Sequence, residues 1–262
     1  MGIGSHYFKF ILPSLMAGDA NINVATIGRQ NSYLSKKVGA EIKSKFGVDV
    51  SKEEHFDSVV NLIKADQKVD AIDYSDYEGA SIVHDLNEPL KPEHKNIFDV
   101  VIDGGTIEHI FDAKTALYNY MSLLKVGGTL YISTPANNQM GHGFYQFSPE
   151  VFFNLFSEKY GFRCDDVILE VNPFMGGELA DGKTYRVKNP KQLGERIMLA
   201  NKRPVVIIIK ATKLQDVDLD SVSKPIQSDY AARYDEAEGA NVREAAKMKS
   251  RVKGFILSLI HI

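Results

Sequence analysis

The stretch Phe98-Asp-Val-Val-Ile-Asp-Gly-Gly-Thr-Ile-Glu-His-Ile-Phe-Asp112 decides the fold of this chain. It contains the apolar run Val100–Ile102, whose β-branched side chains are typical of a strand buried on both faces. The run ends at Asp103-Gly104-Gly105, where two glycines let the backbone turn sharply and let a ligand approach it closely. Open α/β sheets bind ligands at the carboxyl ends of their strands, so the polar residues after this strand predict a binding site.

The segment that follows repeats the pattern. We expect Lys114–Leu124 to form an amphipathic helix, Gly127-Gly128 to end it, and Thr129–Ser133 to form the next strand. A strand, a helix and a strand in this order predict a doubly wound α/β unit.

Further elements extend this unit in both directions along the chain. Five more apolar or β-branched runs predict strands: Ile22–Gly28, Val69–Asp73, Ala80–His84, Phe162–Val171 and Arg203–Thr212. Helices are predicted over 33–46, over 52–65 and from Pro149, where Ser148 is a good cap. The chain therefore predicts a seven-stranded, Rossmann-like sheet whose last two strands are joined without a clear crossover helix.

We expect one α/β domain over residues 1–213 and a charged, helical C-terminal extension over 214–262. Residues 1–21 are expected to form a short helix or lid packed on this domain, and 172–203 an insertion between the last two strands. The apolar part of the N-terminal segment is interrupted by Lys9 and Pro13 and is shorter than the roughly 20 residues that span a bilayer. The last six residues, 257–262, resemble translated adapter sequence, and we leave them out of the fold prediction.

The composition favours a chain with a real core and no strongly charged partner. Hydrophobic residues make up 44% of the 262 positions, which is ample for a core. Lys and Arg total 31 against 34 Asp and Glu, so the net charge of −3 favours neither nucleic acid nor an anionic membrane as partner. The single cysteine, Cys164, excludes an internal disulfide and a cysteine-cluster zinc site, and we expect a cytoplasmic protein.

The order of the motifs resembles the class I S-adenosylmethionine-dependent methyltransferases. The motifs are Gly28 after the first strand, Asp73 at the end of the second, His84-Asp85-Leu86 after the third, the block Phe98–His109, and Leu124-Lys-Val-Gly-Gly-Thr-Leu130. The resemblance covers about Asn23 to Thr212. It implies a mostly parallel sheet with an antiparallel last strand, S-adenosylmethionine as cofactor, and methyl transfer to an oxygen or nitrogen of a small-molecule acceptor.

The chain departs from the family pattern at the first strand. The family usually has three glycines in this turn, whereas Gly28 is followed by Arg29-Gln30-Asn31, and about 45 residues separate Gly28 from Asp73. A dinucleotide needs such glycines because its pyrophosphate lies on the backbone, but S-adenosylmethionine has no phosphate. Two alternatives stay open: a methyltransferase-like binding protein without turnover, and a nucleotide-dependent oxidoreductase.

The resemblance assigns the cofactor to residues near the ends of four strands: Gly28, Arg29, Asp73, Tyr74, Asp85, Leu86, Asp103, Gly104, Gly105 and Glu108. Asp73 would accept hydrogen bonds from the ribose hydroxyls, with Asp76 and Glu78 as local alternatives, and Asp85 with Leu86 would face the adenine. Asp103 and the two glycines would border the methionine portion. Asp73 and Asp85 also lie in good turn sequences, so a structural role for either fits the same residues.

His109 and His142 are the candidate bases, because imidazole titrates near neutral pH. His142 belongs to the glycine-containing loop after the fifth predicted strand, where the fold commonly receives its acceptor. With Tyr145 and Gln146 it is the candidate acceptor-binding set, although an ordinary surface loop explains the same residues. We expect no metal site, because His6, His55, His84, His94 and His261 show no ligand spacing.

Overall fold

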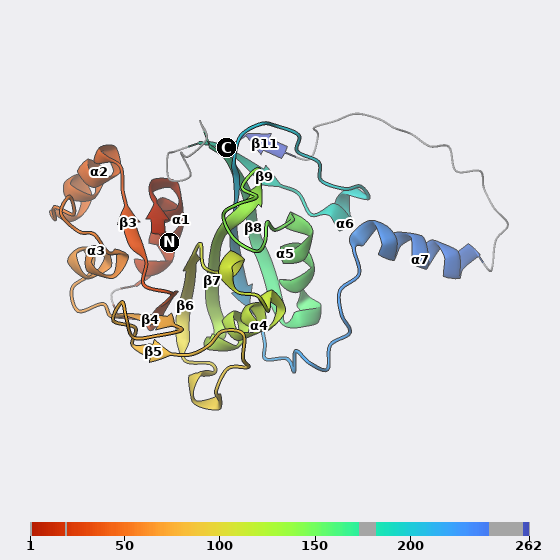
Figure 1. The fold of residues 1–262 in the computed structure, drawn as a ribbon, viewed down its shortest axis with the longest axis horizontal. Coiled ribbons are helices and arrows are strands. Elements are labelled where there is room, and N and C mark those ends of the chain that lie inside the picture. The colour runs from red at the N-terminus through yellow and green to blue at the C-terminus, as the bar shows by residue number, and fades with distance from the viewer. Residues whose placement is uncertain (1, 19, 173–181, 241–258, 262) are drawn as a thin grey trace.

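The structure, a computed structural model, describes residues 2–18, 20–172, 182–240 and 259–261. A mixed β-sheet runs through its centre (Figure 1). Eight strands of this sheet lie between Val24 and Lys213: β2 (Val24–Ile27), β4 (Val69–Asp73), β5 (Ile82–Val83), β6 (Phe98–Gly104), β7 (Leu124–Asn137), β8 (Phe162–Val171), β9 (Lys183–Val187) and β10 (Val205–Lys213). A ninth, β11 (Leu259–His261), pairs with β9 at one edge.

The strand order is β11-β9-β8-β10-β7-β6-β2-β4-β5. The four strand pairs from β5 to β7 are parallel, whereas the four pairs from β7 to β11 are antiparallel. The sheet is thus mixed, and the predicted last strand, β10, is antiparallel to its neighbours. The predicted count of seven strands is wrong, because β9 lies in the segment that was expected to be a surface insertion, and β11 adds another.

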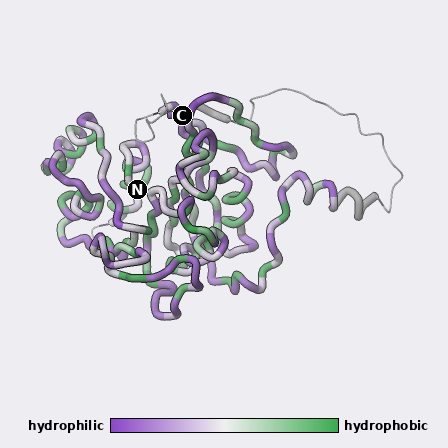
Figure 2. Tube along the Cα trace, in the orientation of Figure 1, coloured by the Kyte–Doolittle hydropathy of each residue, from purple (hydrophilic) through white to green (hydrophobic). Residues whose placement is uncertain are grey.

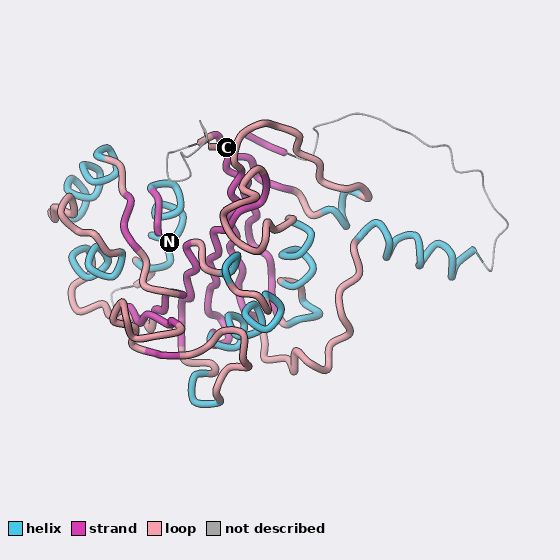
Figure 3. The backbone as a smooth tube through the Cα atoms, viewed as in Figure 1, coloured by secondary structure: helices cyan, strands magenta, loops and turns pink. Residues whose placement is uncertain are grey.

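Helices cover both faces of the sheet (Figure 3). One face carries α1 (Ser5–Leu15), α2 (Lys36–Phe46) and α3 (Phe56–Ile63), and the other carries α4 (Ala113–Leu123) and α5 (Pro149–Leu155). Residues of β6 alternate between these layers: Val100 and Ile102 face the first helix group, and Val101 faces the second. This period of two is what a strand buried on both faces requires.

Hydrophobic positions gather along the strands and hydrophilic ones along the outer loops (Figure 2). Local signals set the helix ends. Ser35 caps α2 by accepting a hydrogen bond from the Val38 N–H, and Gly47 ends it in the left-handed conformation with φ of 75°. Asp112 and Ser148 cap α4 and α5 in the same way.

The N-terminal segment forms β1 (Gly2–Gly4) and α1. Phe8 and Ile11 of α1 are at most 1% exposed and pack with Val100 and Ile102 of β6. This segment is therefore a packed layer of the core rather than a lid over it. β1 pairs with β3 (Asn31–Tyr33), a short strand after β2 that the sequence did not predict.

The remaining elements are short or peripheral: η1 (Pro92–His94), η2 (Ile107–His109), η3 (Glu158–Tyr160), α6 (Pro190–Leu193) and α7 (Ser228–Ala240). The predicted insertion contains β9 and α6, and its residues 173–181 lie outside the described part. The helix predicted for the C-terminal extension is described only as far as Ala240. Of the segment 257–262, the structure describes β11 alone. No helix within the described residues is long and apolar enough to cross a membrane.

Candidate functional site

The order of the parallel strands reverses beside β2, which has β4 and β5 on one side and β6 and β7 on the other. Such a switch point is where open α/β sheets bind ligands. The register places Ile27 of β2 between Ile72 and Asp103, so Gly28 and Gly104 follow on adjacent strands. The predicted cofactor residues after β2, β4, β5 and β6 therefore share one edge of the sheet.

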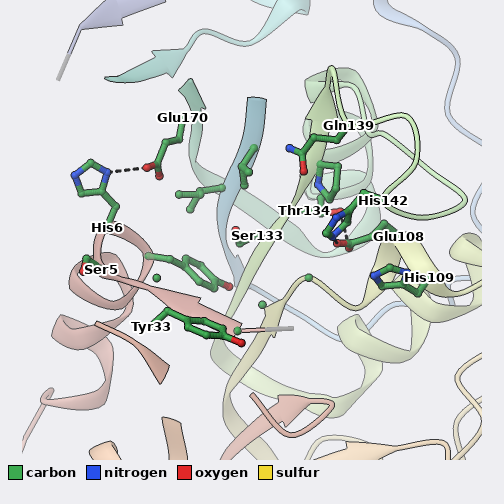
Figure 4. Close-up of a pocket in the computed structure, with 18 residues that line it drawn as sticks. Ser5, His6, Tyr33, Glu108, His109, Ser133, Thr134, Gln139, His142 and Glu170 are labelled. Atoms are coloured by element: carbon green, nitrogen blue, oxygen red, sulfur yellow. Dashed lines mark hydrogen bonds and ion pairs between the residues drawn. The ribbon is translucent and has the colours of Figure 1, made fainter. Parts of the chain in front are cut away.

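A cavity of about 410 Å³ opens on the β6 and β7 side of this switch point (Figure 4). Five predicted site residues line it: Gly104, Gly105, Glu108, His109 and His142. The lining also includes residues that the sequence did not single out, among them Ser5, His6, Tyr33, Ser133, Thr134, Gln139 and Glu170.

The carboxylate of Asp103 holds the turn at the end of β6 from inside the protein. It accepts hydrogen bonds from the backbone N–H groups of Gly105, Thr106 and Ile107 at 2.7–3.0 Å and from the Tyr120 hydroxyl at 3.0 Å. Burial raises the pKa of this carboxyl to about 6, although the hydrogen bonds from these donors act to lower it. Asp103 is 0% exposed and does not line the cavity, and its place beside the methionine portion stays a prediction.

Glu108 is 0% exposed, although its side chain lines the cavity. Its Oε2 accepts a hydrogen bond from Thr134 Oγ1 at 2.9 Å. Its Oε1 has no hydrogen-bond partner among the described residues and lies 3.4 Å from His142 Nε2. Burial, and secondly the nearby charge of Asp103, raise the pKa of Glu108 to about 8.

His109 and His142 lie beside this carboxylate, with their ring centroids 5.4 Å apart. Burial, and secondly the nearby charge of His142, lower the pKa of His109. Glu108, His109 and His142 each offer one ligand atom, and these atoms all lie within 4.8 Å of one another. Sequence reasoning named His109 and His142 as candidate bases but did not group them with Glu108 as metal ligands, because His142 is far along the chain from the other two.

The loop after β7 brings His142 to the site. Its Phe144 N–H donates to the Glu108 carbonyl at 2.7 Å, and a Cβ at Gly143 would lie only 2.7 Å from that oxygen. The predicted acceptor residues Tyr145 and Gln146 do not line the cavity. The Tyr145 hydroxyl donates to the Phe111 carbonyl at 2.6 Å, and Gln146 Oε1 accepts from the Gln139 N–H at 2.8 Å. Both side chains therefore hold the loop in place.

The opposite wall of the cavity carries His6 and Glu170 (Figure 4). Their Nδ1 and Oε1 atoms are 3.1 Å apart, and the same oxygen accepts a hydrogen bond from the Gly182 N–H at 2.9 Å. Sequence reasoning missed both residues. The one available signal was an acid, Glu170, within the otherwise apolar second half of β8, residues 167–171.

The edge beyond β2 is closed where the family pattern has its glycines. Gly28 has φ of 68° and its N–H donates to the Ile72 carbonyl at 2.7 Å. The Gln30 amide nitrogen donates to the Ile27 carbonyl and to Thr106 Oγ1. Its Oε1 is buried without a hydrogen-bond partner among the described residues.

Gln30 and Ile3 together fill the space over Gly104. A Cβ placed on Gly104 would lie 2.5 Å from Gln30 Oε1 and 2.8 Å from Ile3 Cδ1. Arg29 points elsewhere, donating to the Glu78 carbonyl at 3.1 Å and lying 3.4 Å from Asp57 Oδ2.

The other predicted cofactor residues lie on the same edge but outside the cavity. Asp73 is half-buried and its Oδ1 accepts from the Tyr74 N–H at 2.7 Å, while the Tyr74 ring is 72% exposed. Hydrogen bonds from the backbone and side chain of Asn87 lower the pKa of Asp85. Leu86 is 6% exposed and belongs to the core.

No family model matches the chain, and no curated protein matches it. Among solved structures, the chain is similar to the O-methyltransferase from the trans-AT PKS multienzyme of Brevibacillus brevis, solved in complex with S-adenosyl-L-homocysteine. The two sequences are 12% identical and the TM-score is 0.46, and the match covers 94% of this chain and 86% of that chain.

A second similar structure is the 1,6-didemethyltoxoflavin-N1-methyltransferase of Burkholderia thailandensis with S-adenosylhomocysteine, with 13% identity, a TM-score of 0.40, and coverages of 74% and 72%. A third is a 16S rRNA (adenine(1408)-N(1))-methyltransferase from Catenulisporales acidiphilia, with 10% identity, a TM-score of 0.41, and coverages of 76% and 89%. At these identities and TM-scores, the likeness gives no ground for transferring an activity or a residue role to this chain.

Proposed function

We propose that the chain transfers a methyl group from S-adenosylmethionine to an oxygen or nitrogen of a small molecule bound in the cavity. The observation that carries this proposal is the buried oxygen of Gln30 over Gly104, at the switch point of the sheet, which has no hydrogen-bond partner in the described part of the chain. Two hydrogen bonds donated by its amide nitrogen fix which end of the amide is the oxygen. An unsatisfied buried acceptor favours a ligand that brings a donor, and the ammonium of the methionine portion is such a group.

The residues along the edge suit the two ends of the cofactor. Asp73 accepts one hydrogen bond with Oδ1, and as a carboxylate it has further acceptor capacity for ribose hydroxyls. Tyr74, exposed beside it, offers a ring face to the adenosine. At the methionine end, Gln30 would receive the ammonium once Ile3 yields the space over Gly104. When bound, the cofactor supplies an electrophilic methyl group on a sulfonium.

The chain's own part in the reaction is to hold the acceptor and to remove its proton. The lowered pKa of His109 keeps the imidazole neutral near pH 7, which is the form that accepts a proton. Aligning the methyl donor with the acceptor lowers the activation barrier by up to about 7–11 kcal/mol, which is more than proton removal by a base contributes. The described residues that line the cavity include no Lys or Arg, which favours a small neutral or cationic acceptor over a polyanion such as nucleic acid.

The same closed edge favours a second candidate, a methyltransferase-like protein that binds without turnover. In this alternative Gln30 and Ile3 permanently fill the space over Gly104 that the methionine portion of the cofactor would occupy. The oxidoreductase alternative is weakened, because β2 leads into β3 at Asn31 and not into a helix N-terminus that could hold a pyrophosphate.

Calorimetry with S-adenosylhomocysteine tests the proposal. We expect binding in the micromolar range, about −8 kcal/mol. Asp73→Asn should weaken it at least about tenfold, because a charged hydrogen bond contributes roughly 1.5–3 kcal/mol. Asp76→Asn, an exposed acid in the same loop, is the matched control and should bind normally. If the unmutated protein does not bind, or if Asp73→Asn binds equally well, the proposal is wrong. Once binding of S-adenosylhomocysteine is established, a screen of small metabolites with methyl-labelled cofactor identifies the acceptor.

A further inference from the structure

Glu108, His109 and His142 form a compact cluster on one wall of the cavity (Figure 4). Their potential ligand atoms all lie within 4.8 Å of one another. Metal bonds to imidazole nitrogen and carboxylate oxygen are about 2.0–2.2 Å long, so the ligand atoms around one ion lie at most about 4.4 Å apart. His109 and His142 are exposed, and small rotations of their rings close this difference.

Glu108 provides an independent sign of a missing ligand. The residue is 0% exposed, yet its Oε1 has no hydrogen-bond partner among the described residues. This oxygen would lie 3.2 Å from a Cβ on Gly105, which places it against the glycine turn that borders the cavity. A buried carboxylate oxygen without a partner is costly, and a bound cation satisfies it.

The surroundings hold this carboxylate as a metal ligand needs to be held. Thr134 Oγ1 donates to the other oxygen, Oε2, at 2.9 Å, which fixes the carboxylate plane. Such outer contacts orient metal ligands and are part of their affinity. The Phe144 N–H bond to the Glu108 carbonyl ties the loop of His142 to the element that carries the other two ligands.

We propose that Glu108, His109 and His142 bind one divalent transition-metal ion, with its open coordination positions facing the cavity. Two imidazoles and one carboxylate suit Zn²⁺, Co²⁺ or Fe²⁺, whereas Mg²⁺ and Ca²⁺ prefer oxygen ligands. Three protein ligands with an open position are typical of sites that bind a substrate oxygen. This role of the ion rests on the proposed methyl transfer and replaces His109 as the base: the ion polarises an acceptor hydroxyl and lowers its pKa, and His109 then acts as a metal ligand.

The test uses the full-length chain without a histidine tag, stripped with chelator and desalted. Zn²⁺ binding is measured by calorimetry and by metal analysis, and Co²⁺ serves as a spectroscopic probe through its visible absorption. We expect one equivalent of Zn²⁺ per chain. Glu108→Gln, His109→Ala and His142→Ala should each weaken binding at least about tenfold. His94→Ala, a partly exposed histidine outside the cavity, is the matched control and should bind as the unmutated chain does.

Three results would overturn the site: no Zn²⁺ binding by the unmutated chain, binding unchanged in all three ligand variants, or equal competition by Mg²⁺. Thermal unfolding of each variant separates loss of metal from loss of fold, and His142→Ala, in an exposed position, is the variant that best retains the fold. Metal binding needs no S-adenosylmethionine. A chain that binds Zn²⁺ but not S-adenosylhomocysteine would reject the proposed methyl transfer and leave this site intact.

Discussion

The two halves of the sheet edge differ in what lies over them. Beyond β2, Asp73 and Asp85 follow β4 and β5 and lie outside the cavity, and next to β2 the side chains of Gln30 and Ile3 cover one side of Gly104. On the other side, the ends of β6 and β7 border the 410 Å³ cavity. Strand order places residues at an edge, but side chains from other segments decide which part of that edge is hollow.

Asp103 connects the glycine turn to the N-terminal helix. Its carboxylate holds the turn beside the cavity, and its backbone carbonyl accepts a hydrogen bond from the Tyr7 hydroxyl of α1 at 2.8 Å. Asp103→Ala should have the largest effect of the changes considered. It leaves three backbone N–H groups and the Tyr120 hydroxyl without their acceptor in the core. We expect a loss of about 3–5 kcal/mol in the free energy of unfolding, measured by urea denaturation.

Asp99→Ala on the same strand is the matched control. Asp99 is partly exposed, pairs with Lys125 at 2.9 Å and accepts a hydrogen bond from the Asn23 N–H at 2.8 Å, so its removal should cost only about 1–2 kcal/mol. Equal losses in the two variants would mean that Asp103 does not organise the edge.

Gly143→Ala tests whether the loop of His142 depends on close contact with Glu108. The new Cβ would lie 2.7 Å from the Glu108 carbonyl oxygen, which is backbone and cannot turn away. We expect a destabilisation of about 1–3 kcal/mol, measured by thermal unfolding, together with weaker Zn²⁺ binding as the loop shifts.

Gly141→Ala in the same loop has open space around its Cβ and should leave both properties unchanged. If Gly143→Ala also leaves them unchanged, the loop is held by other contacts, and the position of His142 is less constrained than the Phe144 hydrogen bond indicates.

Much of the fold was predictable because its strands are continuous β-branched runs bounded by turn residues. The ranges predicted for Val69–Asp73 and Phe162–Val171 are those of β4 and β8. Predicted site residues of the glycine turn and the Glu108-His109 pair line the cavity, since they follow directly from a buried strand. The β3 strand was not predicted, because Asn31–Tyr33 forms a strand by pairing with the distant β1.

The opposite wall of the cavity could not be predicted for a similar reason. His6 and Glu170 are 164 positions apart, and only the packing of α1 on the sheet brings them together. The filling of the space over Gly104 is likewise a tertiary effect, because Ile3 reaches it from the N-terminal segment. Periodicity reports which face of an element is buried, and it carries no information about which distant segment covers an edge.

Tyr7→Phe gives the smallest expected effect and tests how firmly the N-terminal segment closes the edge. The change removes the hydroxyl that donates to the Asp103 carbonyl and keeps the buried ring, so we expect a loss of about 1 kcal/mol in the free energy of unfolding. Tyr77→Phe, at a ring 90% exposed, is the control and should cost nothing measurable. If the segment must yield for the cofactor, Tyr7→Phe should bind S-adenosylhomocysteine at least as tightly as the unmutated chain, because loosening α1 lowers the cost of moving Ile3. Weaker binding in Tyr7→Phe would instead show that the closed arrangement of β1 and α1 is the one that binds the ligand.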